Sequence, residues 1–225
     1  MGTSEWEQIV DGTISSYTND TVNKVGTHMF YNCANLTYVS FPSASIVEAN
    51  AFENCINLKS ANIDNCKYIS SYAFSYCTSL RYINLPSISQ IYQSAFMQCS
   101  CLKSINCSNV TYLSPGVFNR CISLESIDLP NISSINTLMF AHCESLKSVN
   151  IPNVTIIGLS AFLSCYSLQS ISCPNCLTIS DSAFLGCHSL QNVSFPSATL
   201  ISKYAFSECY GLKSVYFPEV TDVGL

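Results

Sequence analysis

The chain repeats itself every 22 residues, and this period constrains the fold more than any other feature of the sequence. Phenylalanine recurs at that interval from Phe30 to Phe206, nine times in all. A cysteine follows each phenylalanine after three residues, and a leucine follows after three more. One such unit is too short to bury its own apolar face, whereas stacked units form a continuous core. The period therefore predicts a solenoid of nine coils.

The pattern within each unit predicts two short strands. An alternating apolar and polar run follows the leucine, as in 148–151, and this is the period of a strand with one buried face. Seven of the eight prolines come just after this run, where a missing amide donor does not interrupt a strand. An apolar pair such as Val154 and Ile157 then predicts a second extended segment. The segment around Ala-Phe-x-x-Cys predicts a single helical turn or a short 3₁₀ piece. We therefore expect an α/β class dominated by β structure, with coils about 4.8 Å apart.

The two ends of the repeat array differ. Residues 1–27 predict a degenerate N-terminal capping coil, because Gln8 and Asp11 stand where later coils have Phe and Cys. Residues 28–225 predict one continuous solenoid domain. The sequence stops at Leu225 without a polar cap, and an open stack end exposes a sheet edge. We expect this end to be a truncation point or to associate end to end with another molecule.

Composition excludes two classes of partner. The chain is 48% hydrophobic and 10% charged, yet no stretch approaches the roughly 20 apolar residues of a membrane-spanning helix. The formal net charge of −5 opposes a nucleic-acid partner, which is usually met by a concentrated basic face. We expect neither membrane insertion nor nucleic-acid binding. The N-terminal residues show no basic-then-apolar signal sequence.

The repeat resembles a known class. The run Leu-x-x-Ile/Val-x-Leu/Ile recurs, for example at 80–85 and 146–151, and resembles leucine-rich repeats. The fuller pattern Ala-Phe-x-x-Cys-x-Ser-Leu-x-Ser-Val-x-Leu-Pro resembles the BspA-type subclass over residues 28–223. This resemblance implies a right-handed leucine-rich-repeat solenoid. The position that usually carries an asparagine ladder departs from the pattern and holds apolar or small residues, such as Ala44 and Val110.

The resemblance also implies a range of functions. Proteins of this kind are similar to surface and secreted proteins of gut and mucosal microbes, in which the repeats serve adhesion or host-protein binding. Related arrays occur in phage-like and intracellular proteins. Fold alone does not decide between these settings.

The 14 cysteines are interpreted as core residues. Nine belong to the repeated column, where parallel neighbours point the same way and supply the geometry of a disulfide poorly. Four others, Cys66, Cys107, Cys173 and Cys176, occupy columns that are otherwise apolar. The spacing Cys173-x-x-Cys176 also fits zinc or redox chemistry, but no second pair accompanies it. Cys101 replaces a polar residue and predicts an exposed thiol. A thiol-rich core favours a reducing or anaerobic setting.

No catalytic constellation emerges. His28, His142 and His188 fall in different columns and different coils, so no Ser-His-Asp or Cys-His set can be assembled. Acidic residues are scattered, and the constant interval leaves no specialised loop that could form an active site. We expect no enzyme activity, no cofactor and no metal.

The outward columns of the first strand are the candidate binding face. They carry amides, hydroxyls, two tyrosines at the same repeat position, and five of the nine basic residues. Such a face fits a protein or an anionic glycan, although polar ladders also solubilise a sheet and lysines block edge aggregation. The candidate ligand-binding residues are Tyr38, Lys59, Asn62, Arg81, Tyr82, Asn84, Lys103, Asn106, Asp128, Lys147 and Asn150.

A second column contains larger side chains. It could be an apolar stripe for a partner, but packing within a second sheet is the favoured interpretation. Its larger members are Ile46, Tyr68, Tyr112, Ile156 and Leu200.

The leading hypothesis is a non-catalytic protein- or glycan-binding module, adhesin-like, from a secreted or surface microbial protein. The alternative is a structural or assembly spacer in an intracellular or phage-associated protein. The sequence does not identify the ligand.

Overall fold

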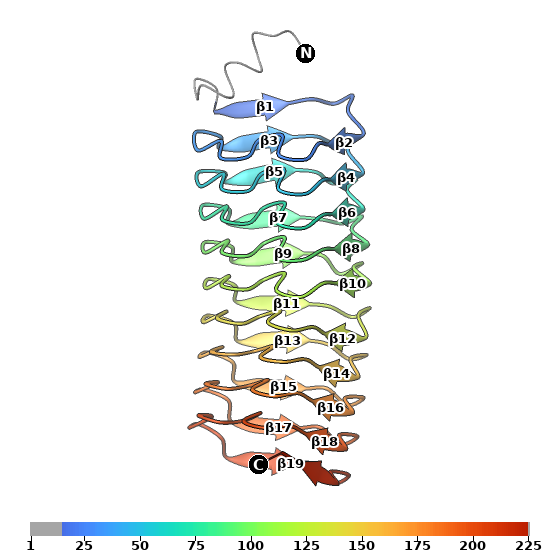
Figure 1. Cartoon of the computed structure of the whole chain (residues 1–225), viewed down its shortest axis with the longest axis vertical. Helices are drawn as coiled ribbons and strands as arrows, with labels where there is room; N and C mark the ends of the chain where they lie inside the picture. The colour runs from blue at the N-terminus through green and yellow to red at the C-terminus, as the bar shows by residue number, and fades with distance from the viewer. Residues whose placement is uncertain (1–14, 225) are drawn as a thin grey trace.

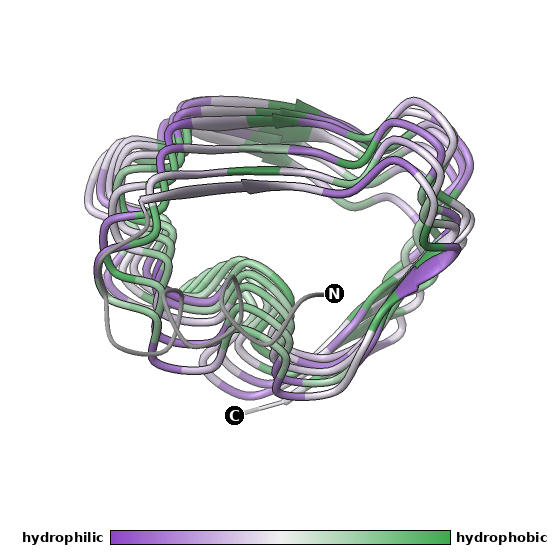
Figure 2. Cartoon of the chain, turned by 90° about the horizontal axis from the view of Figure 1, so that it is seen from above, coloured by the Kyte–Doolittle hydropathy of each residue, from purple (hydrophilic) through white to green (hydrophobic). Residues whose placement is uncertain are grey.

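A computed structural model describes residues 15–224 of the chain. The chain winds into a straight stack of coils, each contributing a three-residue strand and a two-residue strand. Odd-numbered strands lie along one long face and even-numbered strands along a second face (Figures 1 and 2). The predicted β-dominated solenoid is confirmed.

The three-residue strands are β1 (Ser16–Thr18), β3 (Tyr38–Ser40), β5 (Ser60–Asn62), β7 (Tyr82–Asn84), β9 (Ser104–Asn106), β11 (Ser126–Asp128), β13 (Ser148–Asn150), β15 (Ser170–Ser172), β17 (Asn192–Ser194) and β19 (Ser214–Tyr216). The two-residue strands are β2 (Lys24–Val25), β4 (Ile46–Val47), β6 (Tyr68–Ile69), β8 (Gln90–Ile91), β10 (Tyr112–Leu113), β12 (Ser134–Ile135), β14 (Ile156–Ile157), β16 (Thr178–Ile179), β18 (Leu200–Ile201) and β20 (Asp222–Val223).

Strand pairing follows the sequence period. Every recorded pair is parallel and offset by one repeat, as in Tyr38 opposite Ser60 and Tyr68 opposite Gln90. The ladder of odd strands is interrupted between β5 and β7, between β9 and β11, and between β13 and β15. The ladder of even strands is interrupted between β10 and β12. Residues of one sequence column therefore lie in a row along the stack.

The core is built from the inward columns. Rings of the repeated phenylalanine column stack on one another from Phe30 to Phe206, with centroids 5.0–5.9 Å apart. Phe118 and Leu124 are fully buried, as is almost the whole of both columns. Viewed along the stack, hydrophobic segments line the interior of each coil (Figure 2). The continuous apolar core holds the strands in register.

The segment around Ala-Phe-x-x-Cys corrects the predicted helical turn. Residues 15–224 contain no α- or 3₁₀-helix. Instead, the backbone is left-handed two residues before and two residues after each phenylalanine, for example at Asn50 (φ 56°) and Asn54 (φ 62°). Phe52 N donates to Ala73 O of the next coil at 2.8 Å, while Glu53 N donates to Asn50 O at 3.2 Å. Every second amide thus bonds to a neighbouring coil, which a helical turn does not permit.

The repeated cysteines are core residues, as predicted. Cys77 Sγ donates to Phe52 O of the preceding coil at 3.1 Å, and seven further members of the column make the corresponding bond. Burial raises the pKa of the Cys209 thiol to about 11, so the thiol stays protonated and acts as a donor. All 14 cysteines are free.

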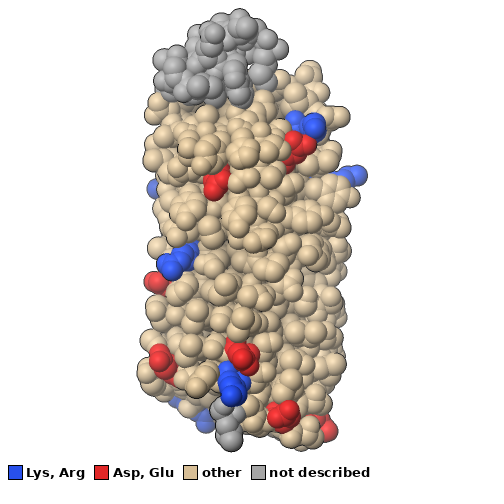
Figure 3. All heavy atoms as spheres, viewed as in Figure 1, with Lys and Arg blue, Asp and Glu red and all other residues tan. Residues whose placement is uncertain are grey.

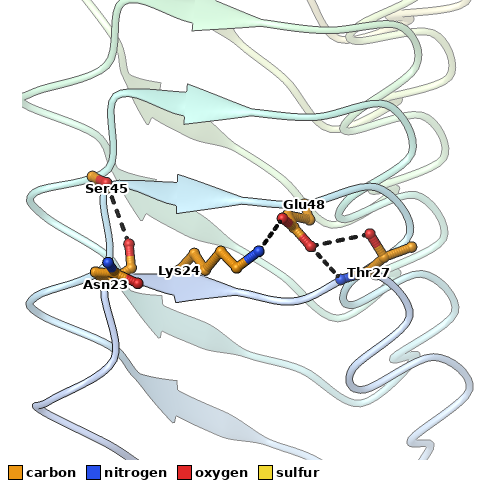
Figure 4. Close-up of polar contacts among 5 residues, drawn as sticks. All are labelled: Asn23, Lys24, Thr27, Ser45 and Glu48. Carbon is orange, nitrogen blue, oxygen red and sulfur yellow. Dashed lines mark hydrogen bonds and ion pairs between the residues drawn. The ribbon is translucent and has the colours of Figure 1, made fainter.

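The first described coil is tied to the second through polar contacts (Figure 4). Lys24 Nζ lies 2.9 Å from Glu48 Oε1, and Thr27 donates to Glu48 Oε2 from its backbone N at 2.9 Å and from Oγ1 at 3.1 Å. These contacts, led by the Lys24 hydrogen bond, lower the pKa of Glu48. Gln8 and Asp11 lie outside the described residues, so the capping role of 1–27 stays a prediction.

Candidate functional site

Seven of the eleven candidate site residues lie in the odd strands, and the other four, Lys59, Arg81, Lys103 and Lys147, each directly precede one. In β3 to β17 the first residue is exposed and the middle residue packs in or against the core, as in Ser126 and Ile127. The third residue, such as Asp128, is exposed or half-buried in all of these strands except β3, where Ser40 is buried. Asn62 and Asn84 are half-buried, while the other nine candidate residues are exposed. The period-two pattern of the strand therefore assigned this face correctly.

Part of this face forms hydrogen-bonded ladders between coils. Asn106 Nδ2 donates to Asn84 Oδ1 at 2.8 Å, and Asn150 Nδ2 donates to Asp128 Oδ1 at 2.6 Å. Lys147 Nζ lies 3.0 Å from Glu125 Oε2, and this contact lowers the pKa of Glu125. These polar groups already have partners, so they support the structural interpretation of the ladder at those positions.

Three basic residues of the same face have no ion-pair partner. Within residues 15–224 no ion pair involves Lys59, Arg81 or Lys103. On the opposite side of the stack, which Figure 3 shows, charged groups are also few and are separated by wide uncharged areas. Lys59, Arg81 and Lys103 succeed one another at a spacing of one coil, and the charge of Lys103 contributes weakly to the lowered pKa of Glu125.

A hollow of about 280 Å³ opens on this face at the junction of β5 and β7. It combines two tyrosine side chains with amides, a hydroxyl and a carboxylate. Four of the candidate residues line it together. The lining residues are Tyr38, Ser60, Ala61, Asn62, Asp64, Tyr82, Ile83 and Asn84.

The hollow exists because the repeat is broken at this place. The middle residue of every other described odd strand from β3 onward is Val or Ile, but in β5 it is Ala61. Ala61 packs against the core, while Ser60, the exposed first residue of β5, stands between Tyr38 and Tyr82 of the neighbouring coils, and its small side chain leaves the space between them open. Asp64 stands where seven other coils carry proline. Ala61 and Asp64 were missed from sequence, although their departure from the columns is a signal that could have found them.

Polar groups around the hollow are linked, with one exception. Asn84 Nδ2 donates to Asp64 Oδ1 at 3.2 Å, and Tyr82 Oη donates to Asn84 Oδ1 at 3.3 Å. Asn62 Nδ2 donates to Ser40 Oγ at 3.1 Å, while Asn62 Oδ1 is buried and has no hydrogen-bond partner. A buried acceptor without a partner costs free energy, about 1–3 kcal/mol. The wall of the hollow therefore holds an unused acceptor.

The column that contains Tyr68, Tyr112 and Ile156 was expected to pack within a second sheet, and this prediction is wrong. Tyr68, Tyr112 and Ile156 are 37%, 45% and 47% exposed, so they point outward from the even strands and do not pack inside. The adjacent residues, such as Ile69 and Leu113, fill the core. Because side chains alternate along a strand, one residue of each pair must face outward.

The remaining titratable groups do not converge on a site. No group of three or more His, Cys, Asp or Glu side chains in the described part of the chain is arranged to hold a metal. His188 stacks between Tyr166 and Tyr210 at 4.9 and 5.3 Å. Partial burial, with a smaller effect of Arg120, lowers the pKa of His142.

Neither the Cys173–Cys176 pair nor the outward Cys101 lines the hollow. Cys173 and Cys176 are buried, and Cys173 Sγ donates to Val154 O at 3.2 Å. The side-chain hydrogen bond with the neighbouring Cys176, and after it burial, raises the pKa of Cys173. Cys101 is exposed, as predicted.

Residues 15–224 include no helix long and apolar enough to cross a membrane.

Solved structures share this architecture. A leucine-rich repeat protein of T. pallidum is similar over 70% of this chain and 79% of its own, with a TM-score of 0.67 and 28% identity. A leucine-rich repeat protein of Eubacterium ventriosum covers 97% of this chain and 83% of its own, with a TM-score of 0.56 and 18% identity. The pneumococcal vaccine antigen PcpA covers 93% and 68%, with a TM-score of 0.50 and 14% identity. These last two similarities concern the fold alone.

Sequence comparison assigns the family. No curated protein sequence matches the chain significantly. The family described as BspA type leucine-rich repeat region, in contrast, matches residues 13–125 and 111–224. With its 22-residue columns, parallel strands and phenylalanine core, the chain belongs to the BspA-type leucine-rich repeat family.

Proposed function

We propose that the chain is a non-catalytic binding scaffold whose ligand face is the outward face of the odd strands. Leucine-rich repeats present a broad surface on a rigid stack, and this geometry suits the binding of a macromolecule. The observation that carries the proposal is the hollow between Tyr38 and Tyr82, where several departures from the repeat meet. A purely structural array gains nothing from such departures.

The finer assignment is an adhesin-like module that binds a protein or a glycan at a microbial surface. Lys59, Arg81 and Lys103 support it, since they form an unpaired basic row beside the hollow. Basic residues at the rim of an interface accelerate association and favour acidic partners. This row gives the module a preference for an acidic host protein or an acidic glycan.

A second candidate is a spacer or assembly element of an intracellular or phage-associated protein. The thiol-rich core favours it, because free cysteines persist best in a reducing environment. The bonded ladder of Asn150 and Asp128 is also consistent with a face that only solubilises the stack.

The proposal is tested by a pull-down of mucosal extracellular-matrix proteins, together with a glycan array. One variant carries Lys59→Glu, Arg81→Glu and Lys103→Glu. Its matched control carries the same change of charge on other faces, at Lys67, Arg120 and Lys203. Binding that is lost in the first variant and kept in the control places the ligand on the odd-strand face. A folded wild-type protein that binds nothing favours the spacer.

A further inference from the structure

We propose that the hollow between Tyr38 and Tyr82 binds a single pyranose ring of a glycan. The inference deepens the proposed function and rests on it, because it assigns a ligand class to one place on the same face. Its basis is the spacing of the two tyrosines, the polarity of the groups between them and the charge around them.

Spacing is the first step. Tyr38 and Tyr82 hold the same repeat position in β3 and β7, two coils apart, and strands stacked about 4.8 Å apart place them about 9.6 Å apart. Carbon atoms in contact lie about 3.5–4.0 Å apart, so a ring between two walls needs about 7–8 Å. The intervening coil presents Ser60 at this position, and its side chain is too small to fill the space. One six-membered ring therefore fits between the tyrosines.

The volume of the hollow also agrees with the binding of a single sugar ring. Pockets for drug-sized ligands measure about 300–1,000 Å³, and the hollow measures about 280 Å³. It is open on the surface of the sheet and accommodates one unit of a longer chain, while the rest of that chain lies along the exposed strands.

Polarity separates a sugar from a purely apolar ring. A tyrosine offers an apolar ring face and a polar tip, which match the C–H face and the hydroxyls of a pyranose. Asn62, Asn84 and Asp64 line the hollow near the carboxyl ends of β5 and β7, and their side chains offer both hydrogen-bond donors and acceptors. Vicinal hydroxyls both donate and accept, so they can bond to amide and carboxylate groups together. Asn62 Oδ1, which has no partner, is the acceptor that a sugar hydroxyl can satisfy after a small rotation of the side chain.

Charge separates a sugar from a cation. Two tyrosines and a carboxylate could also form an aromatic cage for an ammonium group. However, the carboxylate of Asp64 already accepts a hydrogen bond from Asn84 Nδ2 at 3.2 Å. Lys59 and Arg81 directly precede Ser60 and Tyr82 in the chain and have no ion-pair partner in the described residues, so they repel a cation. A neutral or acidic sugar suits the site better.

The test uses variants that alter the hollow and leave the fold intact. Ser60→Tyr places a third tyrosine between Tyr38 and Tyr82, at an exposed position, and fills the space. Tyr38→Ala combined with Tyr82→Ala removes both walls, and both side chains are exposed. Ser126→Ala, in the same column on β11, serves as the matched control. Thermal melts verify that each variant folds.

Binding is measured first on a glycan array with the whole chain, and then by saturation-transfer NMR with the methyl glycosides of the sugars found. Tetramethylammonium is measured as the cationic probe. We expect wild type and Ser126→Ala to bind the same glycans. We expect Ser60→Tyr and the double tyrosine variant to bind them at least about tenfold more weakly.

Three outcomes would overturn the inference. Glycan binding that survives in both hollow variants would place the sugar elsewhere. Tetramethylammonium binding without sugar binding would make the hollow a cation cage. Capture of a matrix protein that Lys59→Glu, Arg81→Glu and Lys103→Glu abolishes, with no glycan bound, would refute the sugar and leave the proposed binding face standing.

Discussion

The odd-strand face is irregular over β3–β7 and regular over β11–β15, although both regions are built on the same 22-residue unit. In the regular region the outward column reads Ser126, Ser148 and Ser170 over Ile127, Val149 and Ile171. In the irregular region it reads Tyr38, Ser60 and Tyr82 over Val39, Ala61 and Ile83. Because the repeated residue in each column is the one that the solenoid fold requires, a different residue in that column calls for an explanation other than the fold.

Hydrogen bonding shows the same contrast. In the regular region Asn150 and Asp128 satisfy one another across coils. In the irregular region Asn62 Oδ1 has no partner. Ser75 Oγ and Asn119 Oδ1 are also buried without a partner, but both lie outside the odd strands, whereas Asn62 Oδ1 lies in β5 beside the hollow.

The largest effect is expected from the shared core. Phe118→Ala in the regular region should lower the free energy of unfolding by about 3–5 kcal/mol, as truncations of buried aromatic residues do. Phe118 is fully buried and stacks on Phe140 at 5.6 Å. Urea denaturation followed by circular dichroism measures it. An unchanged midpoint would contradict the inward position of the column.

An exchange of middle residues tests whether Ala61 is a structural or a functional choice. Val149→Ala should cost about 2 kcal/mol, since two buried methyl groups are lost and a small cavity forms. Ala61→Ile should do the reverse and stabilise by about 1 kcal/mol, because it buries new apolar surface. Both are read from denaturation midpoints. If Ala61→Ile were strongly destabilising, the alanine would be required by packing and the contrast between the regions would vanish.

The polar ladder gives a smaller effect. Asn150→Ala should cost about 0.5–1 kcal/mol, because it removes the exposed bond to Asp128. Asn62→Ala should cost less, since it removes an unpartnered acceptor together with the bond to Ser40 Oγ. Thermal unfolding of both variants shows which substitution lowers the stability more. A larger loss for Asn62→Ala would mean that Asn62 Oδ1 has a hydrogen-bond partner after all.

The smallest effect concerns pH. Lys24 beside Glu48 and Lys147 beside Glu125 lower the pKa of each carboxyl from its usual 4.5. A carboxyl whose pKa is lowered in the folded state stabilises the fold above pH 4.5. This stabilisation is lost as the pH falls through the folded-state pKa. We expect Glu48→Gln and Glu125→Gln each to flatten slightly the decline of Tm below that pH. Glu219→Gln is the control, since no described ion pair involves Glu219. A steep decline retained in both variants would assign it to other carboxyls.

Much of the fold could be predicted from sequence because side-chain columns report burial directly. The strands, the phenylalanine core and the outward face follow from the period. The turn could not be predicted, since its left-handed positions carry ordinary residues such as Leu138 (φ 56°) and Tyr72 (φ 58°). Hydrogen bonds to the neighbouring coil hold those residues there, and no local preference announces them.

The candidate site was predicted only in part. Its residues were chosen for their polarity, which marks an outward face but not a particular place on it. The hollow arises where the small Ser60 stands between two tyrosines and where Asp64 takes the place of a proline. Neither is visible to a search for reactive side chains.

Each buried, hydrogen-bonded thiol of the cysteine column can report on the local opening of its own coil. A thiol such as Cys121 is fully buried and donates to Phe96 O at 3.1 Å, so an alkylating reagent reaches it only when that coil opens. The reporters are chemically alike, so differences in labelling rate along the chain would reflect the opening of individual coils alone. Cys101, which is exposed, supplies the rate of an unprotected thiol in the same molecule. Peptide mass spectrometry of a labelling time course would thus measure how cooperatively the stack unfolds, without any mutation.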